Sequence, residues 1–121
     1  MKALFDTNIL IDYLKGLESA QAELDRHRRR LISRVTWIEV QGGVRNEEEA
    51  DVAEMFLRDF EVIELSRAIA REAAEIRRTT RIRLPDAVIW ASAKHESALL
   101  VTRNTKDFPA DEPGIRIPYQ L

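Results

Sequence analysis

Short apolar runs alternate along this chain with longer stretches in which apolar residues recur every three to four positions. The short runs are typical of buried strands, and the longer periodic stretches indicate helices. We expect strands at 3–5, 31–33, 61–65 and 98–102, with a last edge strand at 115–117. We expect helices at 9–14, 18–30, 35–40 and 47–60, one after Ser66 and one from Leu84.

The alternation of strands with helices predicts a three-layer α/β/α domain with a mostly parallel sheet. Local signals at the helix ends agree with this division, because Ser33 and Ser66 stand at N-cap positions and Gly42-Gly43 follows the third helix. A length of 121 residues suits one hydrophobic core. We therefore expect a single domain over residues 1–121.

Two of the expected helices have distinct faces. Three glutamates occupy the first turn of the helix at 47–60, where the helix dipole favours acids. Its apolar stripe, which we expect in the core, consists of Val52, Met55, Phe56 and Phe60. The stretch at 18–30 is polar and ends in arginines, which predicts a helix that faces solvent.

Carboxylate and amide side chains follow strands or open helices. Asp6 comes directly after the first strand, and Asp86 opens the helix from Leu84, where the dipole favours a carboxylate. Asn104 and Asp107 follow the strand at 98–102. Because ligands of open α/β sheets bind at the carboxyl ends of the strands, we expect these side chains to meet at one edge.

Asp6 admits three roles at that position. It can cap the helix that follows, act as an aspartyl nucleophile, or bind a metal ion at the edge of the sheet. The nucleophile arrangement requires a second aspartate two positions later, where this chain has Asn8. Asp12 lies further into the helix, and we expect it to be a solvent-facing or structural acid.

Glu39 lies about a turn and a half into the helix at 35–40. Its neighbours in sequence are Ile38 and Val40, with Trp37 nearby, so we expect an apolar environment. An acid is costly there unless it is paired or bound to a metal ion. Glu39 is therefore a further candidate ligand.

Acids that converge in one crevice repel each other and would be partly protonated without a cation. Mg²⁺ or Mn²⁺ favours oxygen ligands, can activate water and can stabilise charge on a phosphate. The pattern predicts metal-dependent phosphodiester hydrolysis. The arginines at 77–83, which precede Asp86, are either a solvated face or a track for phosphates.

Composition narrows the class of protein. A net charge of −2 argues against an overall basic nucleic-acid coat, but not against a local basic groove. With no cysteine and two histidines, thiolate zinc sites are excluded and histidine-rich sites are disfavoured. No apolar run approaches membrane-spanning length, so we expect a cytoplasmic protein without membrane contact.

Three stretches together resemble the PIN-domain ribonucleases, and in particular the VapC-type toxins of bacterial and archaeal toxin–antitoxin pairs. They read LFDTNILIDYLKG, SRVTWIEVQGG and LPDAVIWASAKHESALLVTRNTKDF, and they span nearly the whole chain with variable charged helices between them. The resemblance implies that Asp6, Glu39 and Asp86 bind the metal ion. It implies that Thr102 helps to position water or phosphate, with Asn8 as a supporting polar residue.

The resemblance leaves the fourth ligand open. Asn104 occupies a motif position where many members of the wider superfamily carry aspartate, and Asp107 is the remaining nearby carboxylate. A carboxylate attracts a hard cation more strongly than an amide oxygen does, which favours Asp107. The position soon after the strand end favours Asn104.

The resemblance also implies an activity and partners. Such toxins are Mg²⁺- or Mn²⁺-dependent endoribonucleases that cleave structured RNA, often transfer or ribosomal RNA. They form homodimers and are held inactive by a small VapB-like antitoxin. Two alternatives stay open, namely a catalytically silent PIN-like module that binds RNA or protein, and a DNA-directed nuclease of the same fold.

Overall fold

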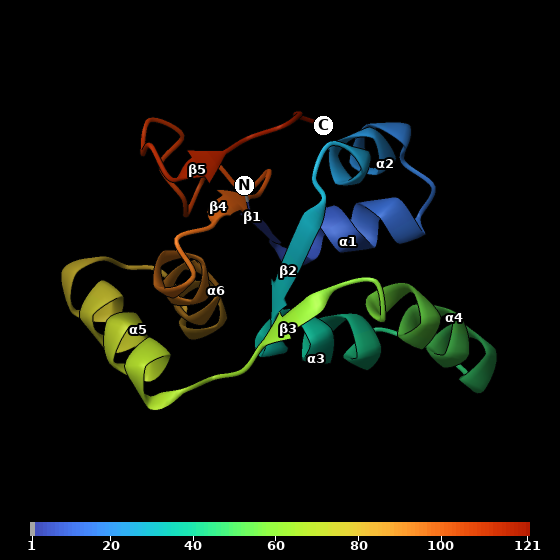
Figure 1. The fold of residues 1–121 in the computed structure, drawn as a ribbon, viewed down its shortest axis with the longest axis horizontal. Coiled ribbons are helices and arrows are strands. Elements are labelled where there is room, and N and C mark those ends of the chain that lie inside the picture. Colours follow the sequence, from blue (N-terminus) through green and yellow to red (C-terminus); the bar gives the residue numbers. More distant parts are fainter. Residues whose placement is uncertain (1) are drawn as a thin grey trace.

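The computed structural model describes residues 2–121, whose strands form one five-stranded sheet (Figure 1). Every pairing between neighbouring strands is parallel. The strands are β1 (Lys2–Phe5), β2 (Arg29–Ser33), β3 (Glu61–Ile63), β4 (Leu99–Val101) and β5 (Ile115–Arg116), in the spatial order β3-β2-β1-β4-β5. The predicted α/β class with a mostly parallel sheet is confirmed.

Helices cover both faces of this sheet. They are α1 (Thr7–Leu14), α2 (Glu18–Asp25), α3 (Arg34–Gly42), α4 (Glu47–Leu57), α5 (Arg67–Thr79) and α6 (Leu84–His95). Figure 1 shows α5 and α6 on one side of the sheet, and α1, α2 and α4 on the other. None of the helices between residues 2 and 121 is long and apolar enough to cross a membrane.

Two apolar cores fill the spaces between the layers. Leu4, Leu31 and Leu100 of three adjacent strands pack with residues of α5 and α6. Phe5 and Ile32, which follow Leu4 and Leu31 in sequence, pack with residues of α1, α2 and α4. Successive side chains of a strand point to opposite faces, so both faces of the sheet are buried.

The order of the strands reverses at β1. From β1 the chain proceeds to β2 and β3 on one side, and then crosses back to β4 and β5 on the other. The crevice at the carboxyl end of β1 is therefore the topological switch point, where open α/β sheets hold their ligands. Asp6 is the first residue after β1, and it lies at this crevice.

The sequence signals for helix ends are confirmed. The hydroxyls of Ser33 and Ser66 accept hydrogen bonds from the backbone N–H groups of Val35 and Ile69, at 3.1 and 3.2 Å. The helix α3 ends at Gly42 as expected. Each cap fixes where a strand or loop turns into a helix, and so sets the direction of the side chains that follow.

The helix expected at 18–30 was wrong in its second half. It ends at Asp25, and Arg29 and Arg30 belong to β2. Both arginines align with residues of β1 in a parallel ladder, and the Arg29 guanidinium lies 2.7 Å from the Glu61 carboxylate on β3. Pairing with the neighbouring strands determines that this segment is a strand, and the local sequence pattern carries no information about that pairing.

The face of α4 that enters the core also differs from the expected one. Val52 and Met55 are 57% and 67% exposed, whereas Ala53, Leu57 and Phe60 are buried. Residues four positions apart share one side of a helix, so Ala53 and Leu57 form the inner face of α4, and Phe60 packs with them just beyond its end. Two apolar side chains of the expected stripe are consequently left at the surface.

Candidate active site

Asp6 is the most enclosed acid at the switch point, with 4% of its surface exposed. Its Oδ1 accepts a hydrogen bond from the Thr7 backbone N–H at 2.7 Å, which caps α1. Its Oδ2 accepts hydrogen bonds from the Thr102 hydroxyl at 2.7 Å and from the Asn8 side-chain amide at 3.2 Å. A carboxylate offers about four acceptor positions, so the capping role leaves room for a cation.

Asn8 and Thr102 join the start of α1 to the end of β4. The Asn8 amide lies 3.3 Å from the Thr102 hydroxyl oxygen, and the Asn8 Oδ1 accepts a hydrogen bond from the Arg103 backbone N–H at 3.4 Å. Asn8 donates a hydrogen bond to Asp6, whereas an ionised aspartate at this position would have no hydrogen to donate. The structure thus places both predicted supporting residues against Asp6.

Glu39 lies on α3 and is exposed, which corrects the expectation of an apolar environment. The helix turns Thr36 and Val40 inward and leaves Glu39 on its outer side. Its Oε1 accepts a hydrogen bond from the Thr7 hydroxyl at 2.6 Å. Glu39 therefore reaches the site through a bond to the residue next to Asp6, and not through burial.

Asp86 lies in the first turn of α6, as the sequence predicted, and it is buried. Its Oδ2 lies 3.5 Å from the Arg83 guanidinium. The negative charges of Asp107 and Glu39 act on Asp86, and those of Asp86 and Glu39 act on Asp6. Asp86 is thus close enough to each of the other three acids to be repelled by them, and we call the four residues the acid cluster.

Asn104 orients Asp107 within this cluster. The Asn104 Oδ1 accepts hydrogen bonds from the backbone N–H groups of Lys106 and Asp107, both at 3.1 Å. Its side-chain amide donates to the Asp107 Oδ2 at 3.0 Å. The amide oxygen of Asn104 is thus occupied by the turn, which favours Asp107 as the fourth acid and gives Asn104 a positioning role.

Burial and mutual repulsion make the cluster unfavourable when it is fully ionised. Burial raises the pKa of Asp6 from 3.8 to about 6, the charges of Asp86 and Glu39 add to the rise, and hydrogen bonds from Thr102 and Thr7 oppose it. Burial also raises the pKa of Asp86, with Arg83 opposing the shift and Asp107 and Glu39 adding to it. A divalent cation would relieve this repulsion.

The donors of the cluster suit a hard cation. Carboxylate, hydroxyl and amide oxygens are the ligands of Mg²⁺ and Mn²⁺, whereas the site offers no sulfur. In their present rotamers, no three acidic or histidine side chains within residues 2–121 converge tightly enough to hold one ion. The Glu39 Oε1 is bonded to Thr7 and the Asp86 Oδ2 lies beside Arg83, so we expect both side chains to turn when an ion binds.

A further acid of α1, Asp12, links this helix to the segment after β4 and to the C-terminal segment. Asp12 is buried and receives two hydrogen bonds from the Arg103 guanidinium, at 2.5 and 3.0 Å, and one from the Tyr119 hydroxyl at 2.8 Å. The bond from Arg103 lowers the pKa of Asp12 below its usual range. Asp12 is thus the structural acid expected. The roles of Arg103 and Tyr119 carry no local sequence signal and were missed.

Replacing Asp6 by asparagine should change how stability depends on pH in the metal-free protein. The folded-state pKa of Asp6, about 6, exceeds its unfolded-state value of 3.8. Protonated Asp6 therefore stabilises the fold fully below about pH 4, and this stabilisation of about 3 kcal/mol is lost as the pH rises through 6. Urea unfolding in EDTA should show Asp6→Asn gaining about this much relative to the parent between about pH 4 and pH 7. Parallel pH profiles would contradict the raised pKa.

The chain is similar to a toxin–antitoxin complex from Klebsiella pneumoniae, with 40% identity and a TM-score of 0.93 over 99% of this chain and 100% of that one. It is also similar to a DNA-bound VapBC from Salmonella typhimurium, with 25% identity and a TM-score of 0.81 over 96% of each chain. VapBC2 from Rickettsia felis, bound to a DNA fragment from its promoter, is similar as well. The identity is 26% and the TM-score 0.80, over 95% of this chain and 96% of that one.

These similarities agree with the resemblance seen in the sequence. No curated protein sequence gave a significant match. The PIN domain family model matches residues 3–110, which is most of the chain. With this match and with the parallel sheet that carries acids at its switch point, the chain belongs to the PIN domain family.

Proposed function

We propose that this protein is a metal-dependent endoribonuclease and the toxin of a type II toxin–antitoxin pair. The observation that carries the proposal is the convergence of Asp6, Glu39, Asp86 and Asp107 at the switch point of a PIN domain. The similarity to a toxin–antitoxin complex at 40% identity supports the biological role. Structured cellular RNA, such as transfer or ribosomal RNA, is the proposed substrate.

The four acids would hold Mg²⁺ or Mn²⁺, and a bound ion of this kind supplies an activated water and stabilises charge on the phosphate. Residues around the acids influence their ionisation and their orientation. Thr102 and Asn8 donate to Asp6 and so favour its ionised form, while Asn104 orients Asp107. The Arg83 guanidinium, which is largely exposed beside Asp86, would neutralise a substrate phosphate.

Two other functions share this fold. A catalytically silent binding module would have no need for four mutually repelling acids, and their presence favours the enzyme. A DNA-directed nuclease differs only in substrate, and cleavage of matched RNA and DNA strands distinguishes the two. The homodimer and the cytoplasmic location stay predictions.

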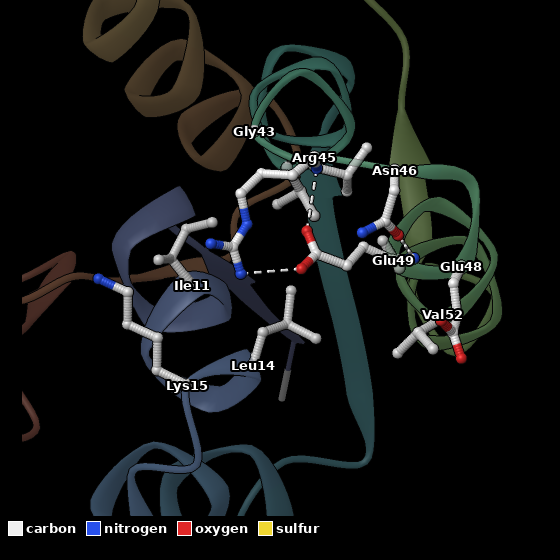
Figure 2. A pocket seen from close by; sticks show the side chains of 12 residues that line it. Ile11, Leu14, Lys15, Gly43, Arg45, Asn46, Glu48, Glu49 and Val52 are labelled. Atoms are coloured by element: carbon white, nitrogen blue, oxygen red, sulfur yellow. Dashed lines mark hydrogen bonds and ion pairs between the residues drawn. The ribbon is translucent and has the colours of Figure 1, made fainter.

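A large groove between α1 and α4 supports an antitoxin partner. Figure 2 shows this groove, of about 690 Å³, with Ile11 and Leu14 from α1 on one wall and Val52 from α4 on the other. Arg45 lies between the two helices and pairs with Glu49 at 3.0 Å. Such an apolar groove with charged edges suits an amphipathic peptide segment. We infer that a VapB-like antitoxin occupies it.

Metal dependence is tested with purified protein freed of any partner. RNA cleavage should require Mg²⁺ or Mn²⁺ and stop in EDTA. Asp86→Asn preserves shape but removes a charge, and it should lower the cleavage rate at least about 100-fold without loss of fold. Asp59→Asn, at an exposed acid outside the cluster, is the matched control and should cleave normally. Cleavage undiminished by the chelator, or by Asp86→Asn, would remove the metal mechanism.

The fourth acid is tested by metal titration. Asp107→Asn should raise the Mg²⁺ concentration needed for half-maximal cleavage by about tenfold, with activity recovered at high metal, because a neutral amide attracts the cation less. Asp111→Asn changes an exposed acid four residues further on and should leave the titration unaltered. A titration curve for Asp107→Asn that matches the parent would show that Asp107 does not bind the metal ion and serves only in the turn.

The groove is tested by co-expressing this protein with the product of any short reading frame found next to its gene, and by measuring whether the two co-purify as a complex. Val52→Asp puts a charge on the groove wall and should abolish the complex. Met55→Asp puts the same charge on an exposed residue of α4 outside the groove and should preserve the complex. Both variants should still cleave RNA. Retention of the antitoxin by Val52→Asp would exclude this groove as its site.

A further inference from the structure

A second, smaller hollow lies beside the acid cluster. It measures about 210 Å³ and is formed by the connection between α5 and α6, at Thr80–Ile82, and by Lys106, Asp107 and Pro109 of the segment after β4, with Trp90 beneath. Asp107 belongs to both the hollow and the cluster. A molecule in the hollow would therefore lie directly next to the reacting centre.

The floor of this hollow is apolar and well supported. Ile82 and Trp90 are both buried, and the Trp90 ring packs edge-on against Phe108 with centroids 5.8 Å apart. The Thr80 hydroxyl donates to the Ile76 carbonyl at 2.7 Å, which ties the connection to the end of α5. A preformed apolar floor binds a flat ring with little ordering cost.

Two cations lie on the walls of the hollow. Arg81 and Lys106 are exposed, and neither forms an ion pair within residues 2–121. Arg81 and Lys106 line the same hollow as Asp107, so both cations lie beside the acid cluster, where they favour an anionic ligand.

We propose that this hollow is a nucleotide subsite, which receives an unpaired base of the RNA next to the phosphate that is cleaved. The base lies over the floor of Ile82 and Trp90, and its flanking phosphates contact Arg81 and Lys106. Sequence-specific RNA recognition uses splayed single-stranded bases, and phosphate contacts position the strand. A hollow of this size admits one base but no duplex, so it selects single-stranded sites. The inference rests on the proposed function.

The test measures binding of a short single-stranded RNA by fluorescence anisotropy over a range of KCl concentrations. All proteins carry Asp6→Asn, so that the RNA stays intact. Arg81→Gln with Lys106→Gln is compared with Arg67→Gln with Arg71→Gln, which removes two exposed arginines from the first half of α5, outside the hollow.

Each phosphate contact to a single strand contributes about 0.7 to the slope of log K against log salt. The hollow pair should therefore reduce the slope by about 1.4 and weaken binding about tenfold or more at low salt. The α5 pair should match the parent. In cleavage-competent protein, the hollow pair should raise KM with little change in kcat.

Several outcomes would overturn the subsite. One is a slope for the hollow pair equal to that of the parent or of the α5 pair, and another is a loss confined to kcat. Tighter binding of the matching DNA strand that depends on Arg81 and Lys106 would assign the hollow to DNA. If the parent neither binds nor cuts RNA, the proposed function fails together with the subsite. If the parent cuts RNA and the hollow pair behaves as the controls do, only the subsite fails.

Discussion

The hydrogen bonds that hold Asp6 at the end of β1 are the constraint on which the site depends. Thr7 and Thr102, from the elements that follow β1 and β4, each contact one oxygen of this buried carboxylate. The same bonds cap α1 and tie two neighbouring strand ends together. The fold thus places a charge where burial disfavours it, and then surrounds it with Asp86 and Glu39, which raise its pKa further. A bound cation would resolve this conflict.

The sequence predicted the fold class and the positions of Asp6 and Asp86 in their elements, because both depend on local patterns. Asp6 and Asp86 stand at a strand end and in a helix first turn, and parallel pairing brings such positions to one edge. The environment of Glu39 was not predictable from its neighbours in sequence, because adjacent helical residues point in different directions. The bonds of Asp12 to Arg103 and Tyr119 join positions far apart in sequence, so only tertiary structure reveals them.

Three surfaces carry the proposed binding of the metal ion, of the RNA base and of the antitoxin. The acid cluster occupies the switch point, the hollow between Arg81 and Lys106 adjoins it through Asp107, and the apolar groove lies between α1 and α4. The segment after β4 links the first two surfaces, since it carries both Asp107 and Lys106. The bond of Arg103 to Asp12 anchors this segment to α1, the helix that also forms one wall of the groove. A peptide bound in the groove would therefore contact α1, the helix that begins directly after Asp6.

The central claim is that the acid cluster binds one divalent cation, and a crystal structure with Mn²⁺ tests it most directly. The anomalous map should show manganese within roughly 2.5 Å of carboxylate oxygens of Asp6 and Asp86. Glu39 should have left the Thr7 hydroxyl to face the ion, directly or through water. A map with no manganese at the cluster, or with Glu39 still bonded to Thr7 and the ion bound elsewhere, would contradict the account.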